Sequence, residues 1–174
     1  MNLASSPALR GRVASLHLHP ATPGASFQNV EVIEVIEAKG ILNDNRYFAR
    51  LSRDSGKPSR RQVSLIEREQ LAEHAAVLGL PAIVPGAVRS NIETSGVNLV
   101  GLVGREIEIG QAVLFLYAPR DPCEKMDAIC RGLREQMMSH RQGVLAEVRR
   151  SGTIRVGDPI RVRQEGVMPA GRAV

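Results

Sequence analysis

The sequence predicts a mainly β protein of the α+β class, in which two or three helices pack on a β-barrel-like core. Short segments rich in Val and Ile dominate both ends of the chain, and glycines interrupt them at short intervals. Only two longer segments show the apolar spacing of a helix. Strands and helices do not alternate, so parallel βαβ winding is the less favoured alternative.

The length and composition predict one domain with an aliphatic core. The chain has 174 residues, of which 43% are hydrophobic and only 3% aromatic. We expect a flexible N-terminus over residues 1–11, a single domain over 12–163 and a flexible tail over 164–174.

The first third of the chain is expected to be strands and loops. The predicted strands are residues 12–20, which end at Pro20; residues 30–40, which end at Gly40; a short strand around Tyr47 and Phe48; and residues 61–66.

The first predicted helix covers residues 67–80. Its apolar face uses Leu71, Ala75 and Leu78, it ends near Gly79, and Ser64 is expected to cap its N-terminus. Short strands between glycines follow, and the chain closes with strands over 143–150, 153–157 and 158–163. Between them a second helix is predicted from apolar positions at helical spacing, namely Met126, Ile129, Cys130, Leu133 and Met137.

Several functional classes are not expected. The charge of +5 is moderate and no run of five basic residues occurs, so we expect no nucleic-acid binding, whereas a positive pocket for a small phosphate-bearing ligand fits the charge. No apolar run approaches the roughly 20 residues of a membrane span, and no signal peptide begins the chain. The four histidines form no zinc motif, and neither a hydrolase elbow nor a phosphate-binding loop is present.

The two cysteines are expected to have different roles. Seven residues along one helix would place Cys123 and Cys130 about 10 Å apart, too far for a disulfide, so both thiols should be free in a reducing cytoplasm. Cys130 lies on the apolar stripe, which indicates packing.

Cys123 is the candidate reactive residue. Asp121 and Glu124 have the spacing of a capping box, which would place Cys123 in the first helical turn, where the thiolate form is favoured. Arg120 and Lys125 flank it and act in the same direction. A thiolate could serve as a nucleophile, a persulfide carrier or a soft metal ligand. The alternative is a small residue fitted into a loop.

Two further groups are polar and basic. Arg89 and Asn91, on either side of Ser90, would lie on one face of a strand and offer a forked donor set for a phosphate or a heterocycle. The other group surrounds Gly40 and consists of Lys39, Asp44, Asn45 and Arg46. For the Arg89 group, the alternative is an exposed, ion-pairing arginine.

Taken in order, these segments resemble the MOSC domain, named for the C-terminal domain of molybdenum cofactor sulfurase. The resemblance runs from about Val13 to Val162 and rests on "KGILNDNRYF", "RQVSLIEREQL", "PGAVRSNIETSGVNLVGLVGREIEIG", "APRDPCEKMD" and "GVLAEVRRSGTIRVGDPI". The family usually has Gly-Asp-Arg in the first block. Here either Asn45 replaces the arginine or Arg46 serves after an insertion.

The resemblance implies a MOSC-type β-barrel whose functional centre is Cys123. In the related amidoxime-reducing proteins the matching cysteine ligates the molybdenum of a pterin cofactor, and those enzymes reduce N-hydroxylated compounds. The cofactor's phosphate and polar pterin would suit Arg89 and Asn91, with Ser90, Lys39, Asp44 and Arg46 as further candidate cofactor-binding residues. Pyridoxal phosphate, associated with the larger sulfurases, is not expected here.

Three hypotheses follow from the resemblance. The first is a molybdenum-cofactor oxidoreductase with a partner reductase, because the sequence has no flavin, haem or iron–sulfur motif. The second is a sulfur carrier that receives a persulfide on Cys123 from a sulfur donor, for the assembly of a metal–sulfur cofactor. The third is a non-catalytic binding module.

Overall fold

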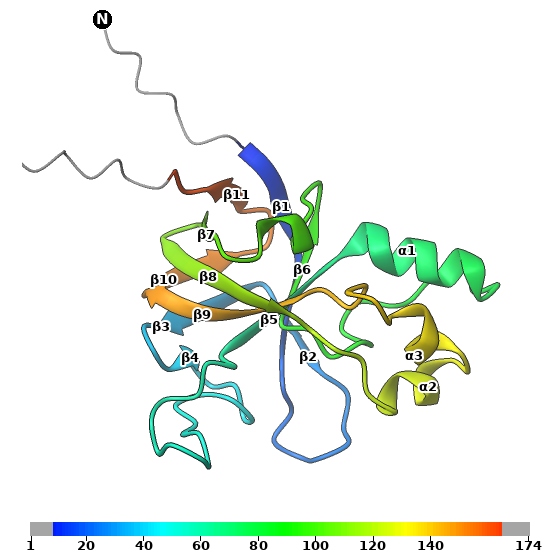
Figure 1. Cartoon of the computed structure of the whole chain (residues 1–174), viewed down its shortest axis with the longest axis horizontal. Coiled ribbons are helices and arrows are strands. Elements are labelled where there is room, and N and C mark those ends of the chain that lie inside the picture. Colours follow the sequence, from blue (N-terminus) through cyan, green and yellow to red (C-terminus); the bar gives the residue numbers. More distant parts are fainter. Residues whose placement is uncertain (1–8, 165–174) are drawn as a thin grey trace, which may run out of the picture.

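The structure, a computed structural model, describes residues 9–164, and most of its strands form one closed sheet (Figure 1). The strands are β1 (Leu9–Leu18), β2 (Gln28–Val30), β3 (Val32–Ile36), β4 (Gly40–Ile41), β5 (Val63–Glu67), β6 (Ile92–Ser95), β7 (Glu106–Ile109), β8 (Ala112–Pro119), β9 (Val144–Arg150), β10 (Gly152–Arg155) and β11 (Pro159–Val162). The larger sheet has the order β11-β7-β8-β9-β5-β6-β1-β2. An additional pairing of β11 with β1 closes seven of these strands into a barrel, which confirms the predicted fold class.

The barrel interior is filled by aliphatic side chains from alternate strand positions. In β7 the pattern is strict, because Ile107 and Ile109 are buried while Glu106 and Glu108 are half-buried at the surface. Other barrel strands and the smaller sheet β10-β3-β4 add Leu, Val and Ile to the same core. The core therefore has the composition that the sequence predicts.

The described helices lie together on one side of the barrel (Figure 1). They are α1 (Arg68–Val77), α2 (Lys125–Ile129) and α3 (Leu133–Gln136), with a single 3₁₀ turn at Val100–Leu102. Strand β5 runs directly into α1, as predicted, and β6 returns parallel to β5, whereas the other ladders of the described residues are antiparallel. A second, smaller core under the helices consists of Ile66, Leu71, Ala75, Ile83, Val88, Met126, Leu133 and Met137.

The predicted cysteine helix does not form as one continuous helix. It is broken into two short helices, because Cys130 is extended (φ −157°) and Gly132 is left-handed (φ 90°). The Asp127 carboxylate accepts N–H bonds from Gly132 and Arg134, which stabilises the start of the second piece. Cys130 lies at the break, half-buried against the smaller core, so its expected packing role is confirmed at the edge of that core.

Two smaller expectations also fail. Tyr47 and Phe48 lie in consecutive turns, with left-handed residues at Asn43 and Ala49 on either side, so no strand forms there. Ser64 is inside β5 and bonds Asn91 instead of capping α1. Residues 9–11, predicted to belong to the flexible N-terminus, are already in β1, and residues 1–8 and 165–174 of the two predicted flexible ends lie outside the described residues.

Candidate functional site

The Asp44 carboxylate organises the turn that follows β4. Its Oδ1 accepts the backbone N–H groups of Arg46 (3.1 Å) and Tyr47 (2.9 Å). Its Oδ2 accepts the N–H of His19 (3.0 Å) and the amide of Asn91 (3.2 Å), and lies 2.8 Å from His19 Nδ1. Burial raises the pKa of Asp44, but the hydrogen bonds from His19 and Tyr47 prevail and lower it to about 2. Asp44 is therefore a satisfied internal anion that fixes the path of Arg46 and Tyr47.

His19 joins this turn to a layer of aromatic rings. Its ring centroid lies 4.3 Å from that of Phe27 and 5.1 Å from that of Tyr47. Burial lowers the pKa of His19 more than the hydrogen bond and charge of Asp44 raise it, and two nearby arginines lower it further. The imidazole is therefore neutral near pH 7, with Nδ1 engaged by Asp44.

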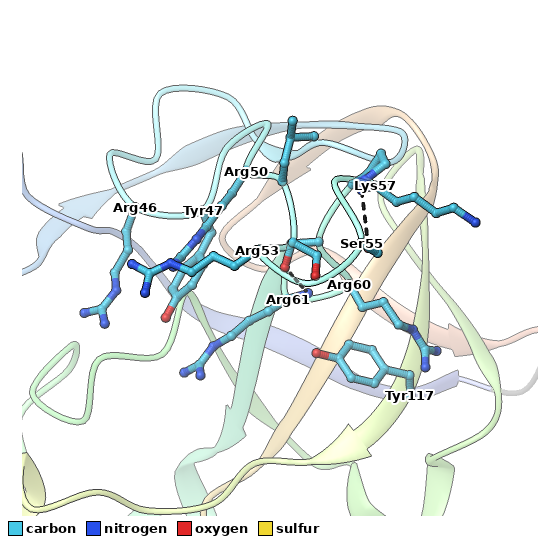
Figure 2. Close-up of a pocket in the computed structure, with 13 residues that line it drawn as sticks. Arg46, Tyr47, Arg50, Arg53, Ser55, Lys57, Arg60, Arg61 and Tyr117 are labelled. Atoms are coloured by element: carbon cyan, nitrogen blue, oxygen red, sulfur yellow. Dashed lines mark hydrogen bonds between the residues drawn. The ribbon is translucent and has the colours of Figure 1, made fainter.

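Arginine side chains surround the Tyr47 ring (Figure 2). The guanidinium carbons of Arg46, Arg50 and Arg61 lie 5.4, 5.6 and 5.0 Å from the ring centroid. Cation–π attraction holds these side chains toward the ring. None of the three arginines forms an ion pair with a carboxylate of residues 9–164. The positive charge around the Tyr47 ring is therefore not neutralised by these carboxylates.

Arg120 is the buried cation of the site. Only 7% of the residue is exposed, and its Nη1 donates to the carbonyl of Val88 (3.3 Å) and to Oγ of Ser90 (2.8 Å). Its Nε is buried without a hydrogen-bond partner, and no carboxylate of the described part of the chain pairs with it. Burial, and then the nearby charge of Arg61, lower the pKa of Arg120 to about 10, so it stays protonated at neutral pH. Such a cation is stabilised by an anion that enters the site.

The backbone around Arg120 explains why no helix begins at Asp121. Strand β8 continues beyond Pro119, since the N–H of Arg120 still bonds the carbonyl of Gly143 at 2.9 Å. Gly143 has φ +72°, and a Cβ there would lie 1.9 Å from the carbonyl oxygen of Leu65. This pairing keeps Arg120 in line with β8, and α2 starts only at Lys125.

Arg89 approaches from the loop between α1 and β6. Its backbone is left-handed (φ 62°), which is unfavourable for an arginine, and its guanidinium carbon lies 4.7 Å from the Phe27 ring centroid. Burial and the charge of Arg46 lower the pKa of Arg89, while the charge of Cys123 raises it. The guanidinium is thus within electrostatic range of both residues.

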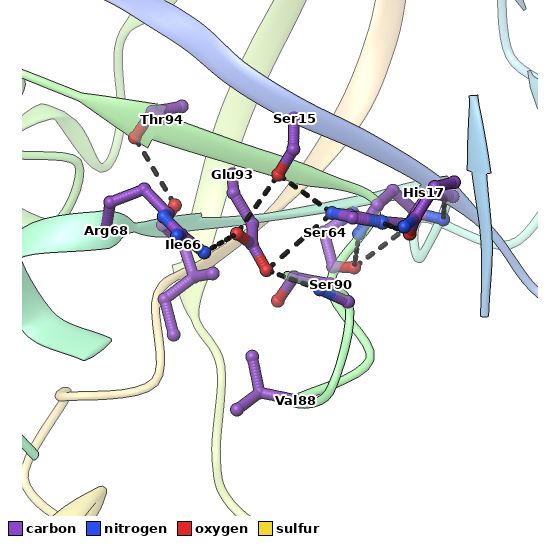
Figure 3. A network of polar contacts seen from close by, with 12 residues as sticks. Ser15, His17, Ser64, Ile66, Arg68, Val88, Ser90, Glu93 and Thr94 are labelled. Carbon is purple, nitrogen blue, oxygen red and sulfur yellow. Dashed lines mark hydrogen bonds and ion pairs between the residues drawn. The ribbon is translucent and has the colours of Figure 1, made fainter. Parts of the chain in front are cut away.

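A buried network holds the loop that carries Arg89 (Figure 3). The Glu93 carboxylate is fully buried and accepts bonds from the Gly86 N–H (2.8 Å), Ser15 Oγ (3.0 Å) and Arg68 Nη1 (2.7 Å). The Arg89 N–H in turn bonds the Gly86 carbonyl at 3.0 Å. We call Ser15, His17, Arg68, Gly86 and Glu93 the Glu93 network, because the His17 Nε2 also lies 3.7 Å from this carboxylate.

Cys123 is a half-buried free thiol in the segment before α2. Its carbonyl accepts the N–H of Met126 at 3.0 Å, and its charge acts on both Arg89 and Arg120. The helix that would have favoured a thiolate starts two residues later, has its N-cap at Glu124 and lacks a side-chain cap, so the capping-box argument is wrong. The arginines linked to Cys123 come from elsewhere in the chain. The charge of Cys123 acts on Arg89 and Arg120, and Arg46 and Arg61 act in turn on these two arginines. We call Arg46, Arg61, Arg89 and Arg120 the arginine cluster.

Three other residues predicted from the sequence do not belong to the arginine cluster. Asn91 and Ser90 are buried, and Lys39 is exposed but does not line the cavity beside Tyr47. Asn91 is 2% exposed and bonds Ser64, the His17 carbonyl and Asp44, so it does not form an open donor set with Arg89 as the strand pattern predicts. Ser90 is fully buried beneath Arg120. Lys39 is exposed in the turn before β4 and does not line the cavity beside Tyr47.

Asn45 and Arg46 have different surroundings in the turn after β4. Asn45 Nδ2 donates to the His19 carbonyl at 2.9 Å, whereas Arg46 reaches the Tyr47 ring. Arg46 is therefore the arginine of this turn that faces the site.

Sequence reasoning missed Arg61 and Arg120 as site residues, together with Tyr47 and His19. The sequence shows Arg120 close to Cys123, and His19 two positions after His17 in a predicted strand. Their burial could not be predicted, because their hydrogen-bond partners are distant in the chain.

The comparisons with known proteins agree with this architecture. A family model of the MOSC domain matches residues 29–161, which is most of the chain. The chain belongs to the MOSC family. No curated protein matches the sequence.

Solved structures share the MOSC fold with this chain. The YuaD protein from Bacillus subtilis superposes with a TM-score of 0.73 at 21% identity, over 87% of this chain and 94% of that one. YiiM from Geobacillus stearothermophilus gives 0.66 at 16% identity, over 90% and 77%, and YiiM from Escherichia coli gives 0.62 at 17%, over 88% and 70%. At these identities the likeness concerns the fold alone.

The described residues contain neither a metal-binding group of side chains nor a membrane-spanning helix. Among residues 9–164, no three or more His, Cys, Asp or Glu side chains are grouped so as to hold a metal ion. The helices of that same part are too short and too polar to cross a membrane.

Proposed function

We propose that this MOSC protein binds a molybdenum–pterin cofactor at Cys123 and reduces N-hydroxylated compounds with electrons from a partner reductase. The observation that carries the proposal is Arg120, a buried guanidinium with an orphaned Nε and no counter-ion in the described chain, beside the half-buried Cys123. A ligand that offers both negative charge and a metal open to a thiol ligand matches this pair.

The side chains present fit the cofactor's chemistry. Its phosphate is anionic, and the arginine cluster supplies four cations without an ion pair among residues 9–164. Arg120 and Arg89 would balance the charge next to the sulfur, and Cys123 would be the protein's ligand to the metal. Asp44 would act indirectly, because it holds the turn that directs Arg46 and Tyr47.

The reaction is a two-electron reduction in which R–NH–OH takes up two electrons and two protons and gives R–NH₂ and water. The bound cofactor would supply the redox chemistry. The chain's contribution is to hold the charge of the reactants in a partly buried setting, where electrostatic interactions are stronger than in water.

The test is elemental analysis of the protein purified from a host that makes the cofactor. We expect close to one molybdenum per chain, loss of the metal in Cys123→Ser and retention in the matched control Cys130→Ser, whose side chain packs at the smaller core. The wild-type protein should also reduce an N-hydroxylated base when a chemical reductant replaces the partner. Equal molybdenum in both variants would overturn the assignment of Cys123. A metal-free protein with cyanide-labile sulfur on Cys123 would identify a sulfur carrier instead, and a protein with neither would be a binding module.

A further inference from the structure

A strongly basic cavity adjoins the arginine cluster and is not explained by a thiol-bound metal. It has a volume of about 750 Å³ and lies between β8 and the loop that joins β4 to β5. Its cationic lining consists of Arg46, Arg50, Arg53, Lys57, Arg60 and Arg61. Tyr47 and Tyr117 complete its aromatic walls (Figure 2).

The charge of this cavity is largely uncompensated. Among the described residues, Arg60 is the one lining cation with an ion pair, and its partner Glu147 is shared with Arg149. No Asp or Glu lines the cavity, and Asp54, in the same loop, forms no ion pair in the part of the chain that the structure describes. Like charges held together repel, so this arrangement favours an anion between them.

The loop is built so that these side chains converge. Leu51 and Pro58 form a β-bridge, and backbone bonds join Ser52 to Lys57 and Ser59 to Arg50. The rings then fix the side chains that the loop presents, because Arg60 lies 4.4 Å from the Tyr117 centroid, while Arg50 and Arg61 lie against Tyr47. At least one guanidinium group thus lies over each ring and can present N–H donors to a ligand in the cavity.

We propose that this cavity binds the phosphate or pyrophosphate group of a small organic phosphate. Guanidinium groups recognise phosphate through paired, charge-assisted hydrogen bonds, and several of them around one cavity match a group with two or more negative charges. Arg46, Arg61 and Tyr47 line the cavity and also act electrostatically on Arg89 or Arg120, the two arginines on which the charge of Cys123 acts. A ligand anchored by its phosphate in the cavity would therefore extend toward Arg89 and Arg120. The anion site depends on the cavity alone, whereas its role in holding the substrate of the reduction rests on the proposed function.

Binding of inorganic pyrophosphate to the purified full chain, measured by calorimetry at low ionic strength, tests the anion site. We expect saturable binding that weakens as salt screens the charges. The double variant Arg50→Gln/Arg53→Gln should bind at least about tenfold more weakly, and Arg161→Gln should change affinity less than about twofold, since Arg161 is an exposed residue of β11, on the barrel end away from the loop (Figure 1). Cys123→Ser should bind pyrophosphate normally, which separates failure here from failure of the proposed function.

Three results would overturn the proposal: no saturable binding, equal weakening in Arg161→Gln, or affinity for single-stranded oligonucleotides that exceeds that for pyrophosphate and grows with length. The molybdenum content of the double variant identifies the source of the phosphate. Retention supports a substrate phosphate, whereas loss would overturn that assignment, because the phosphate would then belong to the cofactor. The substituted side chains are exposed, so the variant should unfold at nearly the wild-type temperature.

Discussion

The Glu93 network and Arg120 of the arginine cluster both carry charge into the interior, but only the Glu93 network contains its own counter-ion. The Glu93 carboxylate is fully buried and accepts three donors, one of them the Arg68 guanidinium. Arg120 is almost as deeply buried, yet its acceptors are a carbonyl and a hydroxyl, and its Nε has none.

This difference separates a structural charge from one that awaits a ligand. The Glu93 network joins β1, β6, α1 and the loop of Gly86, and so it holds the strained backbone of Arg89 in place. The arginine cluster also combines segments that are far apart in the chain, but its four cations form no ion pair among residues 9–164 and leave a net positive charge. Substitutions in the two regions should therefore differ in their effect on folding and on binding.

The largest effect on stability is expected for Glu93→Ala. It leaves the Gly86 N–H and Ser15 hydroxyl without their acceptor and removes the partner of Arg68, so the free energy of unfolding should fall by about 3 kcal/mol, as for other broken buried pairs. Denaturant unfolding measures this loss. Glu93→Gln, which keeps the shape and one acceptor, should lose less, and a loss below about 1 kcal/mol in Glu93→Ala would remove the distinction drawn between the two regions.

A smaller, pH-dependent effect is expected for Asp44→Asn. The folded-state pKa of Asp44, about 2, lies below the unfolded value near 3.8, so the ionised carboxylate stabilises the fold above pH 4 and loses this contribution as the pH falls toward 2. At pH 7 the variant should be less stable by about 2 kcal/mol, or roughly 4–8 °C in melting temperature. The gap between the two proteins should narrow between pH 4 and pH 2. A gap independent of pH would contradict the assignment of Asp44 as a paired anion.

The smallest effect on stability, with a large effect on binding, is expected for Arg120→Met. The substitution removes two hydrogen bonds but also the cost of burying an unpaired cation, a cost whose direction is visible in the lowered pKa of Arg120. The free energy of unfolding of the metal-free protein should therefore stay within about 1 kcal/mol of wild type, while molybdenum retention falls sharply. Chemical unfolding and elemental analysis measure the two quantities. A loss of 3 kcal/mol or more would place Arg120 in the same structural class as Glu93.

The local pattern of the sequence was sufficient for several elements. The run from Arg61 to Ile66 predicts a strand that feeds a helix, and β5 and α1 take that form. Strand β5 is buried at every position, and the buried residues of α1, Leu71, His74 and Ala75, follow helical spacing. The same reasoning failed for the segment after Pro119. Asp121 and Glu124 have the spacing of a cap, but the pairing of Arg120 with Gly143 keeps the backbone extended, and no pattern within ten residues contains that information.

The sequence by itself determined the class of fold, the aliphatic composition of the core and the cysteine and arginine types available for chemistry, since these depend on local spacing and on residue identity. Only the tertiary structure decided which of those residues share a site. The fold brings the arginine cluster and Cys123 within electrostatic range of one another from separate segments of the chain. It also buries Asn91, which the strand pattern had placed beside Arg89 on an open face. Burial and charge compensation depend on neighbours that are distant in the chain, so the unpaired cation at Arg120 becomes visible only after the chain has folded.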